Sequence, residues 1–348
     1  MQASIHSDFM KRALELAALG SGYVAPNPLV GCVIVRHGKI IGEGYHALYG
    51  GPHAEVNAIA SVENPEFLRE STLYVTLEPC AHYGKTPPCA NLIIQKGIPR
   101  VVIGCRDPFS EVNGKGIEQL MKNGVEVILD VLKEECLWLN RRFFTFHEKH
   151  RPYVVLKWAQ SADGFMDVSR DNNVQGSFMI SDPDTQVQVH RWRAEEAAIL
   201  IGKNTLFNDN PSLTVRRVEG KNPLRVVLSA EAIDIGNLQL SNDEAPTVVV
   251  NNHDDYTVGS VYYWSCGDVH NPKNVLNRLH REGVLSVLIE GGAHVLQSFI
   301  DAGLWDEARI ISGSIELHSG LKAPSIEQDF SHEERSATDV IRYYFNPL

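Results

Sequence analysis

The chain of 348 residues is too long for one typical domain and long enough for two, each with its own hydrophobic core. Its 43% hydrophobic content and mean hydropathy of −0.16 exclude a disordered or fibrous protein. The net charge of −11 comes almost wholly from residues 151–348, which hold 17 basic and 27 acidic side chains, so a long polyanion is a poor partner for that half.

The first half alternates helical and strand patterns. Residues 7–22 predict a helix that has Ser7 as its N-cap and glycines at its end. The apolar runs 29–35 and 39–45 flank a short Arg-His-Gly turn and predict a β-hairpin. Further strands are expected at 72–77, 100–104 and 125–129, and further helices at 54–62, 90–97 and 116–124. This order predicts an α/β sandwich around a mostly buried sheet.

A break is expected at residues 140–158, where a basic and aromatic cluster and then Arg151 and Pro152 interrupt the pattern. We therefore predict two domains, 1–148 and 149–348. The second domain again mixes the two patterns. Strands are expected at 153–159, 197–202, 224–229, 246–251, 285–291 and 308–313, and helices at 184–195, 274–283 and 293–303.

The stretch GGPHAEVNAI places His53 and Glu55 two residues apart. Such residues do not face each other in mid-helix, but at a helix start both can converge on one point. Cys80 and Cys89 lie in a Pro-rich loop that enters the next helix, where unpaired backbone N–H groups and the helix dipole favour thiolates. His53, Cys80 and Cys89 would give zinc three protein ligands and leave a fourth position for water, whose pKa zinc lowers to roughly 7.

Other interpretations of these residues remain open at this point. A closed structural zinc site needs a fourth ligand, for which His82 is the nearest candidate, and the cysteines could also be unrelated to metal. Neither alternative gives Glu55 a role, so we favour a catalytic site. The six cysteines have no regular spacing and do not suggest a disulfide framework. Without a membrane-length apolar run or a signal peptide pattern, the sequence predicts a cytoplasmic protein.

The His-x-Glu and Pro-Cys…Cys arrangement resembles the zinc-dependent cytidine-deaminase superfamily. In that superfamily the equivalent of Glu55 deprotonates the water and protonates the departing amine. Members that act on nucleic acids usually have two residues between the cysteines, whereas this chain has eight.

The longer motif LEPCAHYGKTPPC, together with APNPLVGCVIV and DPFSEVNGKGI, is similar to the deaminase half of the bifunctional deaminase/reductase family of riboflavin biosynthesis. The resemblance spans most of the first 120 residues and implies a cytidine-deaminase-like α/β/α sandwich. It further implies that Asn27 contacts the pyrimidine and that His82 and Lys85 lie at the substrate mouth, with Lys85 available to the phosphate. Lys85 could equally be a solvated loop lysine. The segment NGKGIEQL predicts a turn that opens a helix near the zinc loop.

The second half contains no nucleophile elbow, P-loop or Gly-x-Gly-x-x-Gly fingerprint, so its patterns alone indicate only an α/β domain. The segments LKWAQSADG, HRWRAEEAAILIGKNTLFNDNPSLTVR and LIEGGAHVLQSFIDAGLWDE resemble the reductase half of the same family. That half has a dihydrofolate-reductase-like fold and binds NADPH without the fingerprint.

Elementary chemistry supports several positions of this half. Gly291 and Gly292 stand between a buried strand and a helix, where backbone N–H groups can meet a pyrophosphate, although they could simply form a tight turn. Arg193 and Arg216 are forked donors suited to a phosphate or a base carbonyl, or else surface arginines. Asp209 could accept bonds from nucleotide hydroxyls or act only as a turn former.

The resemblance assigns contacts residue by residue. The NADPH contacts would be Ala159, Phe178, Thr205, Asp209, Gly292, Ala293, His294, Val295, Leu296, Gln297 and Ser298. The substrate contacts would be Arg193, Leu213, Arg216 and Glu290. Phe178 stands where many members have Trp, and VVLSA lacks the Asp-Ser often found there, which leaves the adenine or 2′-phosphate contact near Ser229 open.

The leading hypothesis is therefore an enzyme with two consecutive activities. Zinc-dependent hydrolysis would remove the 2-amino group of 2,5-diamino-6-(5-phosphoribosylamino)pyrimidin-4-one, and NADPH would then reduce the ribosyl group to ribityl. The partner would be this small phosphorylated pyrimidine, with no nucleic acid and no membrane, and a homo-oligomer is left open. The alternatives are an RNA base deaminase with an appended domain and a non-catalytic zinc-stabilised module.

Overall fold

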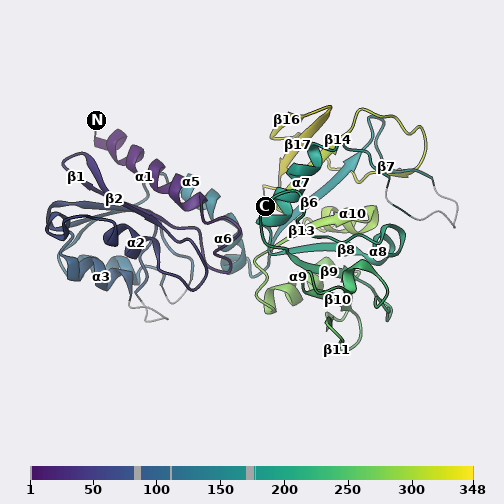
Figure 1. The fold of residues 1–348 in the computed structure, drawn as a ribbon, viewed down its shortest axis with the longest axis horizontal. Coiled ribbons are helices and arrows are strands. Elements are labelled where there is room, and N and C mark those ends of the chain that lie inside the picture. Colours follow the sequence, from purple (N-terminus) through teal and green to yellow (C-terminus); the bar gives the residue numbers. More distant parts are fainter. Residues whose placement is uncertain (1, 82–87, 110–111, 170–175, 177, 348) are drawn as a thin grey trace. The chain divides into compact units, whose positions relative to one another are not determined.

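The computed structural model describes residues 2–81, 88–109, 112–169, 176 and 178–347. It divides into two compact units, Met1–Lys149 and His150–Leu348, and this division falls one residue after the predicted boundary (Figure 1). Among the helices of the described residues, none combines the length and the apolar character that a membrane crossing requires.

The first unit is built on a five-stranded sheet in the order β2-β1-β3-β4-β5. β1 is antiparallel to both β2 and β3, while β3, β4 and β5 are parallel. The predicted hairpin forms as expected, because His37 and Gly38 both have positive φ, as a tight turn between twisted strands requires. The strands are β1 Gly31–Arg36, β2 Lys39–Tyr45, β3 Thr72–Leu77, β4 Arg100–Cys105 and β5 Glu126–Ile128.

Helices cover both faces of this sheet. Residues of α1 and α5, including Met10 and Cys136, pack with Val33 and Val102 on one face, and residues of α2, α3 and α4 pack with Ile34 and Val101 on the other. This arrangement is the expected α/β/α sandwich. The helices are α1 Gln2–Ala18, α2 Ala54–Ala60, α3 Cys89–Lys96, α4 Lys115–Lys122, α5 Lys133–Leu139 and α6 Arg141–Glu148, with a 3₁₀ helix at Pro65–Glu70.

Two details of the prediction for this unit are wrong. Ser7 lies inside α1 and not at its N-cap, because the helix begins at Gln2. The basic and aromatic cluster is not an irregular break but helix α6, whose Phe143 and Phe144 are buried. The side chain of Asn140 explains why this segment belongs to the first unit, since it accepts from the N–H of Leu29 and donates to the carbonyl of Leu29, both at 2.8 Å.

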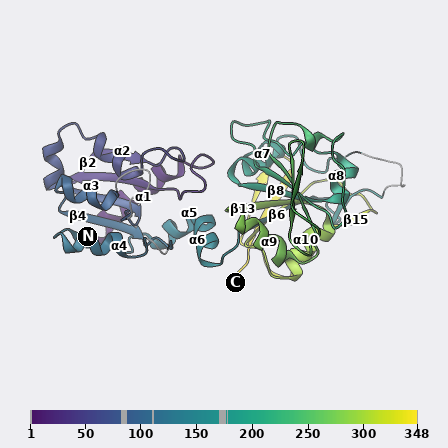
Figure 2. The ribbon, with the colours of Figure 1, turned by 90° about the horizontal axis from the view of Figure 1, so that it is seen from below.

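The second unit contains a ten-stranded sheet in the order β11-β12-β10-β9-β8-β13-β6-β14-β17-β16 and a small sheet of β15 and β7. Figure 2 shows the strands β8, β13 and β6 between α7 on one side and α9 and α10 on the other. The run from β12 to β14 is parallel, and β11, β17 and β16 pair antiparallel at the two ends. The six predicted strands are the central ones: β6 Tyr153–Gln160, β8 Ala198–Gly202, β9 Leu224–Leu228, β10 Thr247–Asn251, β13 Ser286–Gly291 and β14 Glu307–Ser312.

The remaining elements of this unit divide into predicted helices and unpredicted peripheral segments. The predicted helices are α7 Thr185–Glu195, α9 Pro272–Arg281 and α10 Ala293–Asp301. The elements that the sequence analysis did not indicate are peripheral, and most of them are short or exposed: β7 Phe165–Asp167, α8 Lys203–Asp209, β11 Tyr256–Val258, β12 Val261–Ser265, β15 Leu321–Lys322, β16 His332–Ser336 and β17 Asp339–Phe345.

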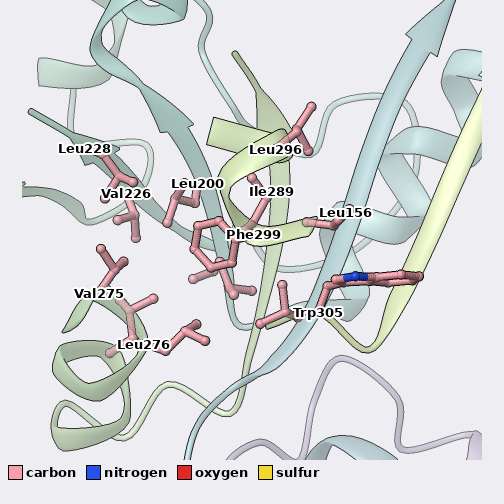
Figure 3. Packing of buried hydrophobic residues seen from close by; sticks show 14 of the residues in the cluster. Leu156, Leu200, Val226, Leu228, Val275, Leu276, Ile289, Leu296, Phe299 and Trp305 are labelled. Atoms are coloured by element: carbon pink, nitrogen blue, oxygen red, sulfur yellow. The ribbon is translucent and has the colours of Figure 1, made fainter. Parts of the chain in front are cut away.

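The core of the second unit lies on both faces of its sheet. On one face, Leu156, Val226 and Ile289 pack against Leu276 of α9 and Phe299 of α10 (Figure 3). On the other face, Val155 and Leu288 pack against Val189 and Trp192 of α7. Because both faces are covered, the central strands are continuous apolar runs, and a charged residue within one of them needs a specific explanation.

Candidate functional sites

The predicted zinc ligands come from three elements of the first unit that end or begin at the same edge of its sheet. His53 is the N-cap of α2, Cys80 follows β3 after Glu78 and Pro79, and Cys89 is the first residue of α3. His53 and Glu55 therefore do lie at a helix start, as the sequence indicated. Helix starts leave backbone N–H groups unpaired, which favours thiolates there.

The three ligand atoms converge. The Nδ1 atom of His53 lies 3.6 Å from the Sγ atom of Cys80 and 3.3 Å from that of Cys89, and all three ligand atoms lie within 4.8 Å of one another. Ligands at ordinary Zn–N and Zn–S distances in a tetrahedron are about 3.6 Å apart, so the set fits zinc. The Cys89 side chain lowers the pKa of Cys80, and so do the His53 side chain and the backbone N–H of Cys89, which donates to the Cys80 sulfur at 3.3 Å.

Glu55 is buried beside these ligands, with 3% of its surface exposed. Burial, followed by the nearby charge of Cys80, raises the pKa of Glu55 to about 7 in the metal-free site. A zinc ion would draw this pKa down again, because a bound cation favours the carboxylate. Glu55 is thus a buried carboxyl group beside the ligands, and its protonation depends on whether the metal is bound.

Asn27 also lies at this site, through a histidine that the sequence analysis missed. Its Nδ2 atom is 3.0 Å from Nε2 of His46, and Nδ1 of His46 is 3.0 Å from the carbonyl of Pro52. His46 can satisfy both contacts as a neutral ring that donates from Nδ1 and accepts at Nε2, and burial lowers its pKa accordingly. The ring centroids of His46 and His53 are 5.6 Å apart, so Asn27 is tied to the neighbourhood of the metal ligand.

Glu78 explains why the DPFSEVNGKGI segment accompanies the zinc motif. Its buried carboxylate accepts from the backbone N–H groups of Gly114 and Gly116 at 3.0 Å and of Ile117 at 3.2 Å. Gly116 is required here, since a Cβ would come within 2.0 Å of the carbonyl oxygen of Pro79. The predicted turn therefore opens α4 directly beside the zinc loop. His82 and Lys85 lie outside the described residues.

In the second unit, Thr205 and the start of α10, which are part of the predicted cofactor set, lie at the carboxyl ends of the neighbouring parallel strands β8 and β13. A Cβ on Gly291 would lie 2.9 Å from Cγ2 of Thr205, and a Cβ on Gly202 would lie 2.9 Å from Cγ2 of Val295. The first turns of α8 and α10 are therefore in close contact. Gly292 is the N-cap of α10 and has φ +82°, a conformation that favours glycine. Such an edge is where open α/β sheets bind phosphate-bearing ligands.

The other predicted cofactor residues differ in what they can offer. The side chain of Leu296 is fully buried in the core, and Gln297 and Ser298 bond within the protein, to Asp301 and to the Val295 carbonyl. The α10 start can therefore offer its backbone more readily than these side chains. The remaining positions are Ala159 near the end of β6, Phe178, which is 42% exposed, and Asp209, which ends α8 instead of lying in a free turn.

The predicted substrate residues Arg193 and Glu290 form a bidentate ion pair, with both N···O distances at 2.7 Å. Lys157 of β6, which the sequence analysis missed, lies 3.8 Å from the same carboxylate. Burial alone would raise the pKa of Glu290, but the charges of Arg193 and Lys157 lower it to about 2. Burial lowers the pKa of Lys157. A lysine in the middle of the apolar run YVVLKWA was the signal that could have revealed this group.

The two other predicted substrate residues, Leu213 and Arg216, lie together on the segment that follows α8. Leu213 is buried, whereas Arg216 is exposed and donates to the hydroxyls of Ser212 and Thr214. The backbone N–H of Arg216 lies 3.1 Å from Nδ1 of His190, a second residue that the sequence analysis missed.

These geometries define a class: a zinc-dependent deaminase joined in one chain to a reductase that binds a nucleotide cofactor. The family model of the cytidine and deoxycytidylate deaminase zinc-binding region matches residues 3–105, and that of the RibD C-terminal domain matches residues 152–326. The riboflavin biosynthesis protein RibD of Aquifex aeolicus is 39% identical over 327 residues, which cover 92% of this chain and 90% of that protein.

Solved structures agree over almost the whole chain. A diaminohydroxyphosphoribosylaminopyrimidine deaminase/5-amino-6-(5-phosphoribosylamino)uracil reductase from Thermotoga maritima is 36% identical with a TM-score of 0.90, and the match covers 99% of this chain and 100% of that one. RibD of Acinetobacter baumannii is 30% identical with a TM-score of 0.89 over the same shares. The chain belongs to the RibD family, the bifunctional deaminases and reductases of riboflavin biosynthesis, which use zinc and NADPH.

Proposed function

We propose that the first unit performs the deamination and the second the reduction, each with the residues described above. The observation that carries the proposal is the convergence of His53 Nδ1, Cys80 Sγ and Cys89 Sγ beside a buried Glu55. Three ligands leave the fourth position for water, as in catalytic zinc sites, whereas a structural site needs a fourth protein ligand. Among the described residues the metal-binding cluster has three members.

In the first reaction, His53, Cys80 and Cys89 hold the zinc. Zinc, when bound, lowers the pKa of a water to roughly 7 and so makes it a nucleophile. Glu55 takes the proton from this nucleophile as it attacks the carbon bearing the 2-amino group, and then delivers a proton to the departing amine, which leaves as ammonia. Asn27, held by His46, contacts the pyrimidine ring and fixes which carbon faces Glu55.

In the second reaction, the β8 and β13 edge binds the cofactor, with the backbone at Gly292 and the α10 start facing its pyrophosphate. NADPH supplies the hydride that reduces the ribosyl group. The ammonium group of Lys157 lies 3.8 Å from the Glu290 carboxylate, and it provides the proton that the reduced group takes up. Arg193 is neutralised by Glu290 and orients it, which leaves Arg216 as the cation for the substrate phosphate.

We further propose that the enzyme acts in the cytoplasm on the small phosphorylated pyrimidine and not on nucleic acid or at a membrane. The acidic excess of residues 151–348 supports this proposal, since it would repel a long polyanion. A homo-oligomer is compatible with it. The alternative of an RNA base deaminase with an appended domain does not account for similarity to RibD proteins over both halves of the chain.

The test supplies the diaminopyrimidine substrate to the purified chain and follows ammonia release, NADPH absorbance and zinc content together. We expect one zinc ion per chain, ammonia before NADPH oxidation, and no ammonia from transfer RNA. Ammonia release that continues after complete removal of zinc would contradict the zinc assignment. NADPH oxidation without prior deamination would contradict the proposed order.

A further inference from the structure

His190 of α7 is a buried polar residue to which the proposed chemistry assigns no task. Only 3% of its surface is exposed, and its Nδ1 atom lies 3.1 Å from the backbone N of Arg216. A backbone N–H can only donate, so Nδ1 accepts and carries no proton. The ring is therefore neutral, with its proton on Nε2.

The charged surroundings keep the ring in this form. Arg193 lies one turn further along α7, Arg216 and Arg217 lie on the contacting segment, and Glu290 projects from β13. Burial, followed by the charges of Arg193 and Arg216, lowers the pKa of His190 to about 4. The acceptor at Nδ1 is thus present throughout the neutral range.

Three hydrogen bonds to the backbone of segment 212–217 hold it in place. Besides the bond to His190, the carbonyl of Thr214 accepts from Arg193 at 3.3 Å, and the N–H of Val215 donates to Asn222 at 2.7 Å. Leu213 has φ +51°, a costly conformation for a leucine that persists only where neighbouring contacts impose it. The segment is therefore kept in one conformation by its contacts and not by its own preference.

The guanidinium of Arg216 is the exposed end of this arrangement. It donates to two neutral hydroxyls, those of Ser212 and Thr214, and within the part of the chain that the structure describes it has no carboxylate at ion-pair distance. Arg193, which donates to the carbonyl of the same Thr214, is instead neutralised by Glu290. Glu244 attracts this charge without forming an ion pair, so Arg216 keeps a guanidinium that a phosphate dianion can bind, on the segment that contacts Arg193.

We infer that His190 is a positioning residue of the reductase: by holding the backbone of Arg216, it aims the guanidinium at the phosphate of the phosphorylated substrate. The inference rests on the proposed function, in which Arg216 binds that phosphate. His190 acts through Arg216 and touches no reacting atom.

The experiment compares His190→Leu with His190→Asn in the full-length, zinc-loaded chain. Leucine removes the acceptor, whereas the Oδ1 atom of asparagine stands near the place of Nδ1 and can accept the same N–H. Val189→Ala, a buried neighbour on the same helix, controls for lost packing. NADPH oxidation is followed with 5-amino-6-(5-phosphoribosylamino)uracil and with its dephosphorylated riboside.

We expect H190L to raise the KM for the phosphorylated substrate about tenfold, the worth of one hydrogen bond, with kcat little changed. H190N should restore the KM to near the wild-type value, and V189A should leave it unchanged. With the riboside, which has no phosphate to bind, all four proteins should have the same KM. If H190L does not fold, His190→Gln takes its place, since the longer amide reaches the Nε2 position and leaves the Arg216 N–H without its acceptor.

The second arm repeats H190L in an Arg216→Gln background, where the inference predicts no further rise in KM. A full additional rise, or an equal rise for the riboside, would overturn the inference. If R216Q raises the KM and H190L does not, the inference is wrong while the phosphate assignment survives. If R216Q itself leaves the KM unchanged, the assignment of Arg216 is wrong and the inference falls with it.

Discussion

The two sites of this protein are assembled in different ways. The zinc site draws all its ligands from 37 residues of sequence, and each ligand stands at or near the end of one element. The proposed reductase site draws Lys157, Arg193, Arg216 and Glu290 from a stretch of more than 130 residues. Metal ligands must be specific residue types at bonding distance, and here they form a recognisable local sequence motif. Backbone donors and paired charges need no such motif, because strands distant in the sequence can supply them at one edge of a sheet.

The largest expected effect separates the two sites completely. Cys80→Ser should lose zinc and deamination together, because a hydroxyl is a far poorer zinc ligand than a thiolate. Reduction of the already deaminated uracil substrate should continue, since its proposed site holds no metal ligand. Metal analysis and the two separate assays check this. Cys266→Ser, in the second unit, is the matched control and should retain zinc, and full zinc occupancy in C80S would refute the ligand assignment.

The next effect sharpens the roles within the zinc site. Glu55→Gln should keep zinc but slow deamination by about 10² to 10⁴, because glutamine fills the same space and cannot accept a proton. The exposed Glu63→Gln serves as the control. Loss of metal in E55Q would make Glu55 a ligand and not the acid/base group.

A smaller effect tests the cofactor edge of the second unit. Gly291→Ala would bring a Cβ to 2.9 Å from Thr205 Cγ2, so the Thr205 side chain or the start of α8 must shift away from the end of β13. Overpacking of this kind costs about 1–3 kcal/mol of folding stability, and we expect the displaced edge to bind NADPH more weakly. Fluorescence titration with NADPH measures it. Unchanged affinity in a folded G291A chain would argue against this edge, and deamination should not change.

The smallest effect concerns stability against pH. His190 has a pKa of about 4 when folded and about 6.5 when unfolded, so the folded state binds its proton less readily. Its contribution to stability is therefore complete above about pH 6.5 and is lost as the pH falls towards about 4. Urea unfolding at pH 7.5 and 5, followed by tryptophan fluorescence, should show a smaller loss in H190N than in the wild type. An equal loss would mean that His190 is not the group that titrates.

Much of the fold could be predicted because the central elements carry strong periodic signals. The six buried strands of the second unit and five strands of the first were found within a few residues. The elements that escaped prediction are the peripheral ones. β16 is polar and largely exposed, and α8 is short and buries only Leu206, so neither carries the apolar period on which such a prediction depends.

The site residues divide in the same way. His53, Glu55, Cys80 and Cys89 were readable because their chemistry and spacing are local. Lys157, His46 and His190 could not be predicted in this way, because the role of each depends on a partner elsewhere in the sequence. These partners are Glu290, Asn27 and Arg216, respectively.

By itself, then, the sequence predicted the two-domain boundary and the zinc ligands with their acid/base partner, and it gave the α/β class and the family that the comparisons show. Periodicity suffices for the fold class and local chemistry for the predicted ligands, whereas the family came from the resemblance of long motifs. Only the tertiary structure decided that α6 belongs to the first unit, that Arg193 is neutralised by Glu290 while Arg216 is not, and that a neutral His190 holds the backbone of Arg216. Whether a charge is paired, and whether a ring nitrogen accepts or donates, depends on which groups folding places beside it. The spacing of residues in the sequence does not show which groups these are.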